Sequence, residues 1–296
     1  MKILITGRTG QLVTSFIERS RAVSGVEVVA LGRPELDLEN PLALGEAVAR
    51  VGPDVVINAA AYTAVDLAED EPDRAFAVNA EGAGALARAS RAAGARFVQI
   101  STDYVFDGAS DRPYREDDPV NPLGAYGRSK LAGEQAVRDE DLDAVVVRIA
   151  WVYSPFGRNF LKTMISASSQ RDELAVVADQ VGNPSSALDL ADGLLALVAA
   201  WRESPRIGLG QTYHLTGGGE ASWHGFAEEI LTRSARLGGP TARVRPIATE
   251  EWPTKAPRPR DSRLDSAKFA RDFGYRAPEW QLATEETVRR LLAAGA

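Results

Sequence analysis

Lys2-Ile3-Leu4-Ile5-Thr6-Gly7-Arg8-Thr9-Gly10-Gln11-Leu12-Val13 is the stretch that decides the fold. A short apolar strand over Lys2–Thr6 runs into two glycines, and the pattern after them predicts a helix over Gln11–Arg21. Glycines at a strand-to-helix turn let the backbone approach a pyrophosphate, which the N-terminus of the helix stabilises. We therefore expect Gly7 and Gly10 to bind a dinucleotide, although an ordinary strand-to-helix turn would explain the same two glycines.

Strand and helix patterns alternate through the first half of the chain and predict an α/β fold. Short apolar strands separated by helices indicate a parallel sheet covered on both faces, and right-handed crossovers then give a Rossmann-type, doubly wound sheet. The expected strands are Lys2–Thr6, Val26–Leu31, Val55–Asn58, Arg96–Ser101 and Ala144–Ile149. The expected helices are Gln11–Arg21, Leu42–Val51, Asp73–Ala93 and Tyr126–Arg138.

The sequence changes character after about Trp151, where Pro, Gly and Arg become more frequent. Residues Pro246–Arg263 predict a long loop, whereas Trp223–Leu237 and Ser266–Phe273 predict helices. A smaller C-terminal substrate-binding region would cover a ligand at the carboxyl ends of the strands. We expect a dinucleotide-binding domain of residues 1–150 plus roughly 172–205, and a substrate-binding domain of residues 151–171 and 206–296.

Composition excludes several classes of protein. The 296 residues are 45% hydrophobic and carry a formal net charge of −7, which argues against a nucleic-acid binder. The chain has no cysteine, so disulfides, thiolate metal sites and cysteine nucleophiles are excluded. No stretch approaches about twenty apolar residues, which predicts a soluble, cytoplasmic protein without membrane partners. His214 and His224 lack a metal-ligand spacing, and no metal site is predicted.

The end of the second expected strand bears on the choice of cofactor. It reads Leu31-Gly32-Arg33, with Asp37-Leu38 shortly after. The Arg33 guanidinium matches the geometry of the ribose phosphate of NADP, although a solvated loop arginine is an equal alternative. The sequence therefore slightly favours NADPH and leaves NADH open.

Tyr126-Gly127-Arg128-Ser129-Lys130 carries the main catalytic signal. On a helix, Tyr126 and Lys130 are four residues apart and share one face. A free phenol has a pKa of about 10, and a neighbouring ammonium with an oxidised nicotinamide would lower it towards the working range. Lys130 would also hold the nicotinamide ribose.

Hydroxyl groups end the neighbouring strand, in Ser101-Thr102-Asp103-Tyr104-Val105-Phe106. The carboxyl ends of the strands are where a doubly wound sheet binds its ligands. Thr102, more than Ser101, is expected to donate a hydrogen bond to a substrate carbonyl and to stabilise the developing alkoxide. The glycine turn, the strand end and the Tyr-x-x-x-Lys helix together indicate a dehydrogenase site.

These residues resemble those of the dTDP-4-dehydrorhamnose reductase family, a branch of the extended short-chain dehydrogenases, over nearly the whole chain. The resemblance rests on stretches in both halves: Asn58–Asp66, Ser101–Gly108, Tyr126–Glu134, Arg148–Tyr153, Asp179–Pro184, Ser222–His224 and Arg258–Ser262. The Tyr-Lys pair belongs to the whole superfamily. Ser-Thr-Asp-Tyr-Val-Phe, Asp-Gln-x-Gly-x-Pro and Arg-Pro-x-x-Ser point more narrowly to the family.

The resemblance implies that NAD(P)H reduces the 4-keto group of a dTDP-linked 6-deoxyhexulose, dTDP-4-dehydro-β-L-rhamnose, to dTDP-L-rhamnose, with Tyr126 protonating the alkoxide. It assigns to the cofactor Gln11, Leu12, Asp37, Leu38, Ala60, Ala61 and Tyr62. It assigns to the substrate and the chemistry Thr102, Asp103, Tyr126, Lys130 and Trp151. Trp151 would wall the sugar pocket, and Arg258 in the basic loop would bind the pyrophosphate.

Three positions depart from the family pattern. Val13 replaces the third glycine of the GxxGxxG turn, and Asp261 stands where an asparagine is usual. Some relatives dimerise through magnesium held by acidic residues, one of them early in the first helix, where this chain has Ser15. A magnesium-linked dimer is therefore doubtful, and a monomer or homodimer is expected.

Two other functions remain open at this stage. One is a reductase of another nucleotide sugar, and a related possibility is a nucleotide-sugar epimerase. An epimerase would retain tightly bound NAD⁺ and run without added cofactor. A non-catalytic regulatory subunit of the same fold is the third hypothesis. The intact Thr102, Tyr126 and Lys130 argue against it, because a binding subunit needs no proton donor.

Overall fold

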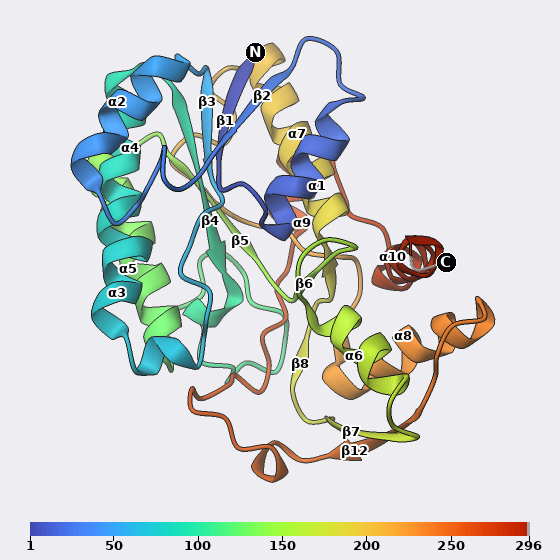
Figure 1. Ribbon diagram of the computed structural model, residues 1–296. Helices are drawn as coiled ribbons and strands as arrows, with labels where there is room; N and C mark the ends of the chain where they lie inside the picture. Colours follow the sequence, from blue (N-terminus) through green and yellow to red (C-terminus); the bar gives the residue numbers. More distant parts are fainter. Residues whose placement is uncertain (295–296) are drawn as a thin grey trace.

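The computed structural model describes residues 1–294 and has a six-stranded parallel sheet at its centre (Figure 1). The strands are ordered β10-β5-β4-β3-β1-β2, and every pairing is parallel. Their bounds are β1 Lys2–Thr6, β2 Glu27–Leu31, β3 Val55–Asn58, β4 Arg96–Thr102, β5 Val145–Ile149 and β10 Thr212–His214. The predicted doubly wound α/β sheet is confirmed.

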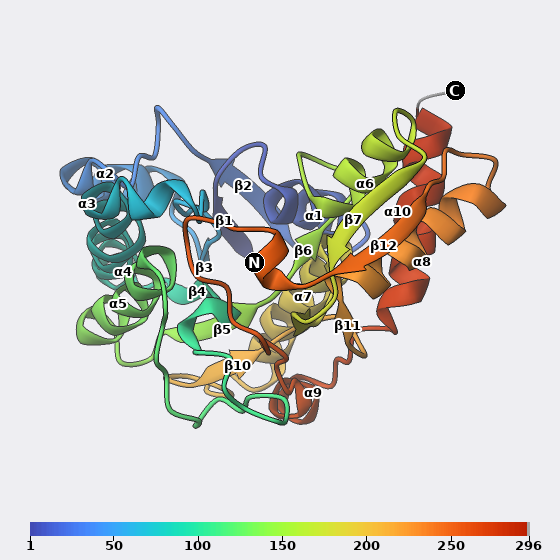
Figure 2. The same ribbon diagram turned by 90° about the horizontal axis from the view of Figure 1, so that it is seen from below.

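Helices cover both faces of this sheet, because strands that are apolar along their whole length need cover on each side. One group comprises α2 Pro41–Val51, α3 Pro72–Phe76, α4 Gly82–Ala92 and α5 Ala125–Glu140, and the other comprises α1 Gln11–Ser20 and α7 Ala187–Glu203. Figure 2 shows the two groups on opposite sides of the strands. The short helix α9, Ala267–Phe273, packs beside β10.

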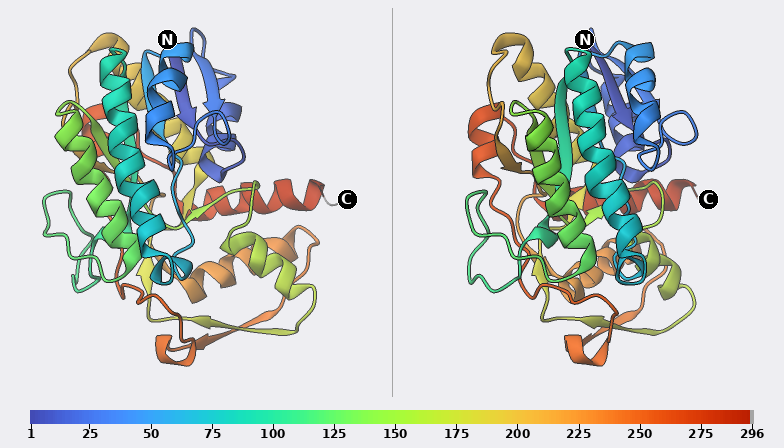
Figure 3. Two further views of the ribbon diagram at one scale, coloured as in Figure 1. Left: turned by 60° about the vertical axis from the view of Figure 1, so that its left-hand side comes forward. Right: turned by 90° about the vertical axis from the view of Figure 1, so that its left-hand side faces the viewer.

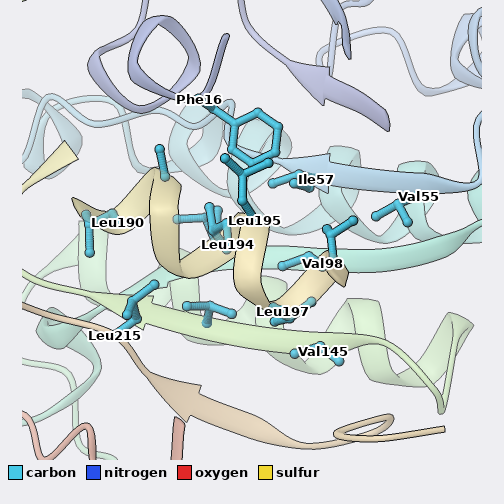
Figure 4. Packing of buried hydrophobic residues seen from close by; sticks show 14 of the residues in the cluster. Phe16, Val55, Ile57, Val98, Val145, Leu190, Leu194, Leu195, Leu197 and Leu215 are labelled. Carbon is cyan, nitrogen blue, oxygen red and sulfur yellow. The ribbon is translucent and has the colours of Figure 1, made fainter. Parts of the chain in front are cut away.

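Leucines of α7 and Phe16 of α1 form the core on one face of the sheet (Figure 4). They pack on strand residues such as Ile57, Val98 and Val145, all of them fully buried. Burial of a large apolar side chain contributes roughly 1.5–3 kcal/mol, so this layer holds the sheet in place. A second cluster, centred on Leu44, Leu86 and Phe97, does the same on the opposite face.

A second lobe lies beyond the carboxyl ends of the strands (Figure 1). It contains α6 Phe160–Ser168, α8 Trp223–Arg236, and the parallel pair β7 Glu173–Val177 and β12 Arg243–Ile247. Two short pairs connect it to the sheet, β6 Val152–Tyr153 with β9 Ser185–Ser186 and β8 Val181–Gly182 with β11 Ala221–Ser222. Helix α10, Trp280–Ala294, lies between the two lobes (Figure 3) and pairs Arg290 with Glu18 of α1.

The five strands expected in the first half are present with small shifts at their ends. The single continuous helix expected over Asp73–Ala93 is wrong, because a π-helical turn, Ala77–Glu81, separates α3 from α4. The loop expected over Pro246–Arg263 is wrong at its start, since β12 reaches Ile247 and a 3₁₀ turn follows over Thr249–Glu251. Helices α6, α7 and α10 were not among the expected elements.

The division into 1–150 with 172–205, and 151–171 with 206–296, stays a proposal. For two segments, β7 and β10, the strand pairing favours placing each in the opposite domain from the one proposed. Strand β7 pairs with β12 in the second lobe, whereas β10 forms the edge of the main sheet. Within residues 1–294, no helix combines the length and apolar character needed to cross a membrane.

Candidate active site

The site lies at the carboxyl end of the sheet, where β1 and β3 are neighbours although the chain forms β2 between them. Such a switch of strand order opens a crevice, because the connections on its two sides run to opposite faces. Gly7 follows β1, Ala60 lies just beyond β3, and Thr102 ends β4. Helix α5 then brings Tyr126 and Lys130 to the end of β4.

Lys130 is buried and donates to the carbonyl oxygen of Ile100 over 2.7 Å. Burial lowers the pKa of its ammonium to about 8, and the carboxylate of Glu134, one helical turn away, opposes that shift. The lysine is therefore fixed beside β4 by a hydrogen bond to the backbone.

Tyr126 is half-buried, and its ring packs edge-on against Tyr104 with 5.7 Å between centroids. Burial raises the pKa of its phenol well above the usual range, while a hydrogen bond with Thr102 lowers it. The Lys130 ammonium is bonded to the Ile100 carbonyl in this structure, and the lowering of this pKa by Lys130 together with an oxidised nicotinamide stays a prediction. A neutral phenol is the form that donates a proton.

Thr102 and Asp103 form a buried pair at the end of β4. The threonine hydroxyl donates to Oδ1 of Asp103 over 2.9 Å. Burial raises the pKa of the Asp103 carboxyl to about 6, against hydrogen bonds from Ser262 and Thr102. Its Oδ2 is buried and has no hydrogen-bond partner in the described part of the chain, so Asp103 keeps an unused acceptor at the end of β4.

A chain of buried hydrogen bonds crosses the strand ends from the glycine turn to the lysine. Thr6 Oγ1 donates to Asn58 over 2.7 Å, and Asn58 donates to Gln99 over 2.9 Å. Gln99 in turn donates to the same Ile100 carbonyl that Lys130 binds. The strand end before the glycine turn and Lys130 are thus connected by one polar network.

The glycine turn has the geometry needed for close approach of a phosphate. Gly7 has φ of +108°, and a Cβ there would lie 3.1 Å from Cγ2 of Val13. A Cβ on Gly32 would lie 3.3 Å from the backbone of Gly7, so two bare backbones meet at the ends of β1 and β2. Val13 is buried in the core beneath the turn. The replacement of the third glycine therefore leaves the turn intact, and its residues fit a dinucleotide pyrophosphate.

The other residues expected to bind the cofactor lie around the same crevice. Ala60 donates its backbone N–H to Thr6 Oγ1 over 2.9 Å, and Tyr62 donates its N–H to Asn79 of the π-helical turn over 2.8 Å. Leu38 is buried against Gly82. The Arg33 side chain is 66% exposed and approaches Glu39 at 3.5 Å, so it is available to a ligand. Ala61 precedes Tyr62 in the chain. The carboxylate of Asp37 accepts a hydrogen bond from the backbone N–H of Glu39.

Gln11 and Leu12 begin α1 directly after the turn. Leu12 is buried in the core. The amide of Gln11 accepts hydrogen bonds from Ser154 and from Asn159, each over 2.9 Å. Sequence reasoning missed these two partners, although Asn159 precedes Phe160 as the N-cap of α6 and carried that local signal.

Arg258, in the distant basic loop, contacts Asp66 and Tyr104. Its Nη2 donates to Asp66 over 2.8 Å, and its guanidinium lies 5.9 Å from the ring centroid of Tyr104. Nη1 is buried without a partner in the described residues. Tyr104, which links Arg258 to Tyr126, was not predicted as a site residue, although it belongs to the Ser-Thr-Asp-Tyr-Val-Phe stretch.

Asp261 is neutralised by Arg263, whose Nε lies 2.9 Å from both carboxylate oxygens. The unusual acidic residue therefore presents no free charge to a phosphate. His214 is buried in β10, with its Nδ1 3.1 Å from the Tyr114 carbonyl oxygen, and His224 lies in α8. Neither histidine joins the cluster of Thr102, Tyr126 and Lys130.

Comparisons with known proteins cover the whole chain. The family model described as the RmlD substrate binding domain matches residues 1–293. The chain is similar to dTDP-4-dehydrorhamnose reductases of Burkholderia thailandensis, at 44% identity over 99% of this chain and 100% of the relative. It is also similar to the dTDP-4-dehydrorhamnose reductase of Sinorhizobium fredii, at 41% identity over 100% of this chain and 99% of the relative.

Two solved structures share the fold and more than a third of the sequence. A dTDP-4-dehydrorhamnose reductase of Clostridium acetobutylicum superposes with a TM-score of 0.90 at 42% identity, covering 99% of this chain and 100% of that one. The Bacillus anthracis enzyme of the same name, in complex with NADP, gives a TM-score of 0.88 at 35% identity, covering 97% and 98%. The likeness therefore includes both lobes.

Proposed function

The chain belongs to the RmlD substrate binding domain family, and from that membership we propose that it is a nicotinamide-dependent oxidoreductase acting on a nucleotide sugar. The reaction proposed is reduction of the 4-keto group of dTDP-4-dehydro-β-L-rhamnose to the hydroxyl of dTDP-L-rhamnose. One observation carries it: Thr102, Tyr126 and Lys130 are assembled at the end of β4, with the phenol held neutral. The identity of the sugar is inferred from the names of the relatives.

The proposed chemistry divides between the cofactor and three side chains. When bound, a reduced nicotinamide supplies hydride to the carbonyl carbon. The Thr102 hydroxyl, which donates to Asp103 in this structure, would turn its proton to the carbonyl oxygen and stabilise the negative charge that develops there. The Tyr126 phenol transfers its proton to that oxygen, which yields the alcohol and leaves a phenolate. Lys130, with its pKa near 8, is mostly an ammonium at neutral pH, and it would stabilise the phenolate on turning from the Ile100 carbonyl towards Tyr126.

The proposed cofactor site follows the crevice between β1 and β3. Gly7, Gly10, Gln11 and Leu12 would face the pyrophosphate, and Arg33, Asp37 and Leu38 the adenosine end. Ala60, Ala61, Tyr62, Tyr126 and Lys130 would line the nicotinamide half. NADPH is favoured slightly, because the exposed Arg33 suits a ribose phosphate and a similar enzyme binds NADP.

The proposed substrate site lies between the strand end and the second lobe. Asp103 would accept a sugar hydroxyl at its unpaired Oδ2, and Trp151 would wall the hexose. The buried, unpaired Nη1 of Arg258 would donate to the pyrophosphate.

The test is Tyr126→Phe, which removes the proposed proton donor and leaves the aromatic packing against Tyr104. We expect turnover of the dTDP-keto-sugar to fall by about 10²–10⁴-fold, the usual contribution of a positioned acid. The dissociation constant for NADPH, measured by calorimetry, should stay within about twofold.

Tyr275→Phe is the matched control, because it removes a hydroxyl that donates to the Asp189 carbonyl, away from the proposed site. It should keep full turnover. Equal rates for Tyr126→Phe and the parent would refute the mechanism. Purified protein carrying tightly bound NAD⁺ and needing no added cofactor would instead favour an epimerase, and failure to bind any nicotinamide nucleotide would favour a regulatory subunit.

A further inference from the structure

Trp151 has a backbone conformation that its side chain disfavours. It follows β5 with φ of +45°, the one residue other than glycine with positive φ in residues 1–294. A bulky side chain in this region strains the backbone, and such strain persists where surrounding contacts enforce it. Strain of this kind at a strand end, beside a proposed sugar pocket, requires a structural cause.

Three residues, here called the indole support, enforce the position of Trp151: Gly182, Trp223 and Ser262. The indole stacks on Trp223 with 3.6 Å between centroids and 5° between planes. Its Nε1–H donates to Ser262 Oγ over 3.1 Å. A Cβ on Gly182 would lie 2.3 Å from the indole Cε2, so no larger residue fits there.

The indole support comes from three separate parts of the chain. Gly182 belongs to Asp-Gln-x-Gly-x-Pro, Trp223 to Ser-Trp-His, and Ser262 to Arg-Pro-x-x-Ser. The backbone joins two of them, since Ser262 donates its N–H to the Val181 carbonyl over 2.8 Å. None of the three residues has a part in the proposed chemistry, yet all meet at one indole ring.

Ser262 also connects the indole to the reacting end of β4. It is 2% exposed, and its hydroxyl, which accepts from the indole, has one proton left to donate. Ser262 also opposes the rise that burial causes in the pKa of the Asp103 carboxyl, whose Oδ1 accepts from Thr102 over 2.9 Å. One buried serine therefore lies between the indole of Trp151 and the carboxylate of Asp103.

We propose that Gly182, Trp223 and Ser262 are positioning residues that hold Trp151 in its strained conformation, and that Ser262 sets the spacing between Trp151 and Asp103 for the hexose. The inference rests on the proposed function for the identity of the sugar. The support contacts Trp151 at the end of β5, whereas the glycine turn follows β1. Loss of the indole support should therefore weaken binding of the keto-sugar and leave cofactor binding unchanged.

The test is Ser262→Ala, with Ser262→Thr as the variant that restores the hydroxyl. For Ser262→Ala we expect KM for the dTDP-keto-sugar to rise about tenfold, with kcat reduced less than about threefold and the dissociation constant for NADPH unchanged. Ser262→Thr should return KM most of the way to the value of the parent protein. Ser234→Ala is the matched control, since it removes an equally buried serine hydrogen bond, to the Pro240 carbonyl, in α8.

A second readout does not need the substrate. The chain has five tryptophans, so ¹⁵N-labelled indoles give few N–H signals, and Trp151→Phe identifies the one from Trp151. Ser262→Ala should move that signal upfield, because its hydrogen bond is lost, and Ser234→Ala should not.

An unmoved indole signal, an unchanged KM, or a parallel loss of NADPH and sugar binding would each overturn the inference. If the parent protein does not reduce the keto-sugar, the proposed function fails, and the indole signal alone decides on the support.

Discussion

Glu134 has no part in the proposed chemistry, yet it lies one helical turn beyond Lys130 in the interior of the protein. Its carboxylate accepts from Arg148 at Nε over 2.9 Å and at Nη2 over 2.7 Å, and from Ser101 Oγ over 2.6 Å. The two charged side chains are 1% and 4% exposed. Since Ser101 precedes Thr102, this ion pair ties α5 and β5 to the strand end that carries the proposed catalytic hydroxyl.

We predict that Glu134→Gln lowers the free energy of unfolding by about 3 kcal/mol or more, because Arg148 is left buried without its counter-charge. The same change in an exposed pair, Glu286→Gln beside Arg289, should alter stability by about 0.5 kcal/mol at most. Urea denaturation of both variants measures the difference. Equal losses in the two would show that burial does not matter here.

The grouping of the proposed catalytic residues was predictable because their relation is local. Tyr126 and Lys130 share a helix face at a spacing of four, and Thr102 ends an apolar strand. The support for Trp151 was not predictable, because Ser262 lies 111 residues away along the chain. The same holds for the contact of Arg258 with Asp66, in which a loop arginine becomes half-buried through the tertiary fold. No pattern within a short window indicates such partners.

Helix α5 packs very closely on its neighbours, and two glycines permit it. A Cβ on Gly127 would lie 2.2 Å from the Tyr104 carbonyl oxygen, and one on Gly133 would lie 2.0 Å from that of Asn79. Both obstacles are backbone atoms, so the helix itself would have to move. Because Gly127 follows Tyr126, that movement would displace the proposed proton donor.

We predict that Gly127→Ala destabilises the protein by about 1–3 kcal/mol, the usual cost of overpacking. It should also reduce turnover by at least about tenfold, since small displacements of a catalytic group are costly. Gly45→Ala is the control, because nothing lies within 4 Å of its Cβ position in α2. That variant should gain about 0.5–1 kcal/mol from helix propensity. Thermal unfolding and steady-state rates measure both, and normal turnover in Gly127→Ala would contradict the packing argument.

The elements of the first half were predictable from apolar strands and Ala-rich helices, but their irregularities were not. The Ala-rich run over Asp73–Ala93 predicts an uninterrupted helix, whereas the π-helical turn at Ala77–Glu81 directs Asn79 towards the site. There the Asn79 amide bonds the backbone of Tyr62 and the hydroxyl of Ser129. The turn exists because of tertiary hydrogen bonds, which helix propensity does not encode.

At the scale of the whole molecule, the C-terminal half returns twice to the first lobe. Strand β10 adds three residues to the edge of the sheet, and α7 covers one face with its leucines. Pairings such as β7 with β12, about seventy residues apart, depend on the completed fold. A strand of three residues carries no periodic signal, so the pairing of β10 with the main sheet was not predictable from sequence.

His214 in β10 makes this edge sensitive to acid. Its ring is fully buried between the Tyr114 carbonyl and Phe106, and Nε2 has no partner in the described residues. Burial first, and then the charge of Arg148 on the adjacent strand, lower its pKa from 6.5 to about 3. Because the unfolded chain binds a proton below pH 6.5 and the folded chain does not, this histidine stabilises the fold fully above that pH and progressively less below it.

We therefore compare the parent with His214→Asn, which keeps a donor for the Tyr114 carbonyl but does not titrate. Above pH 7 the difference in unfolding free energy between the two should be constant. Between pH 6.5 and pH 4 it should change by about 3 kcal/mol in favour of the variant, at 1.36 kcal/mol per pH unit. Urea denaturation at several pH values measures it, and a difference that stays constant down to pH 4 would mean that the buried imidazole accepts a proton without loss of the sheet edge.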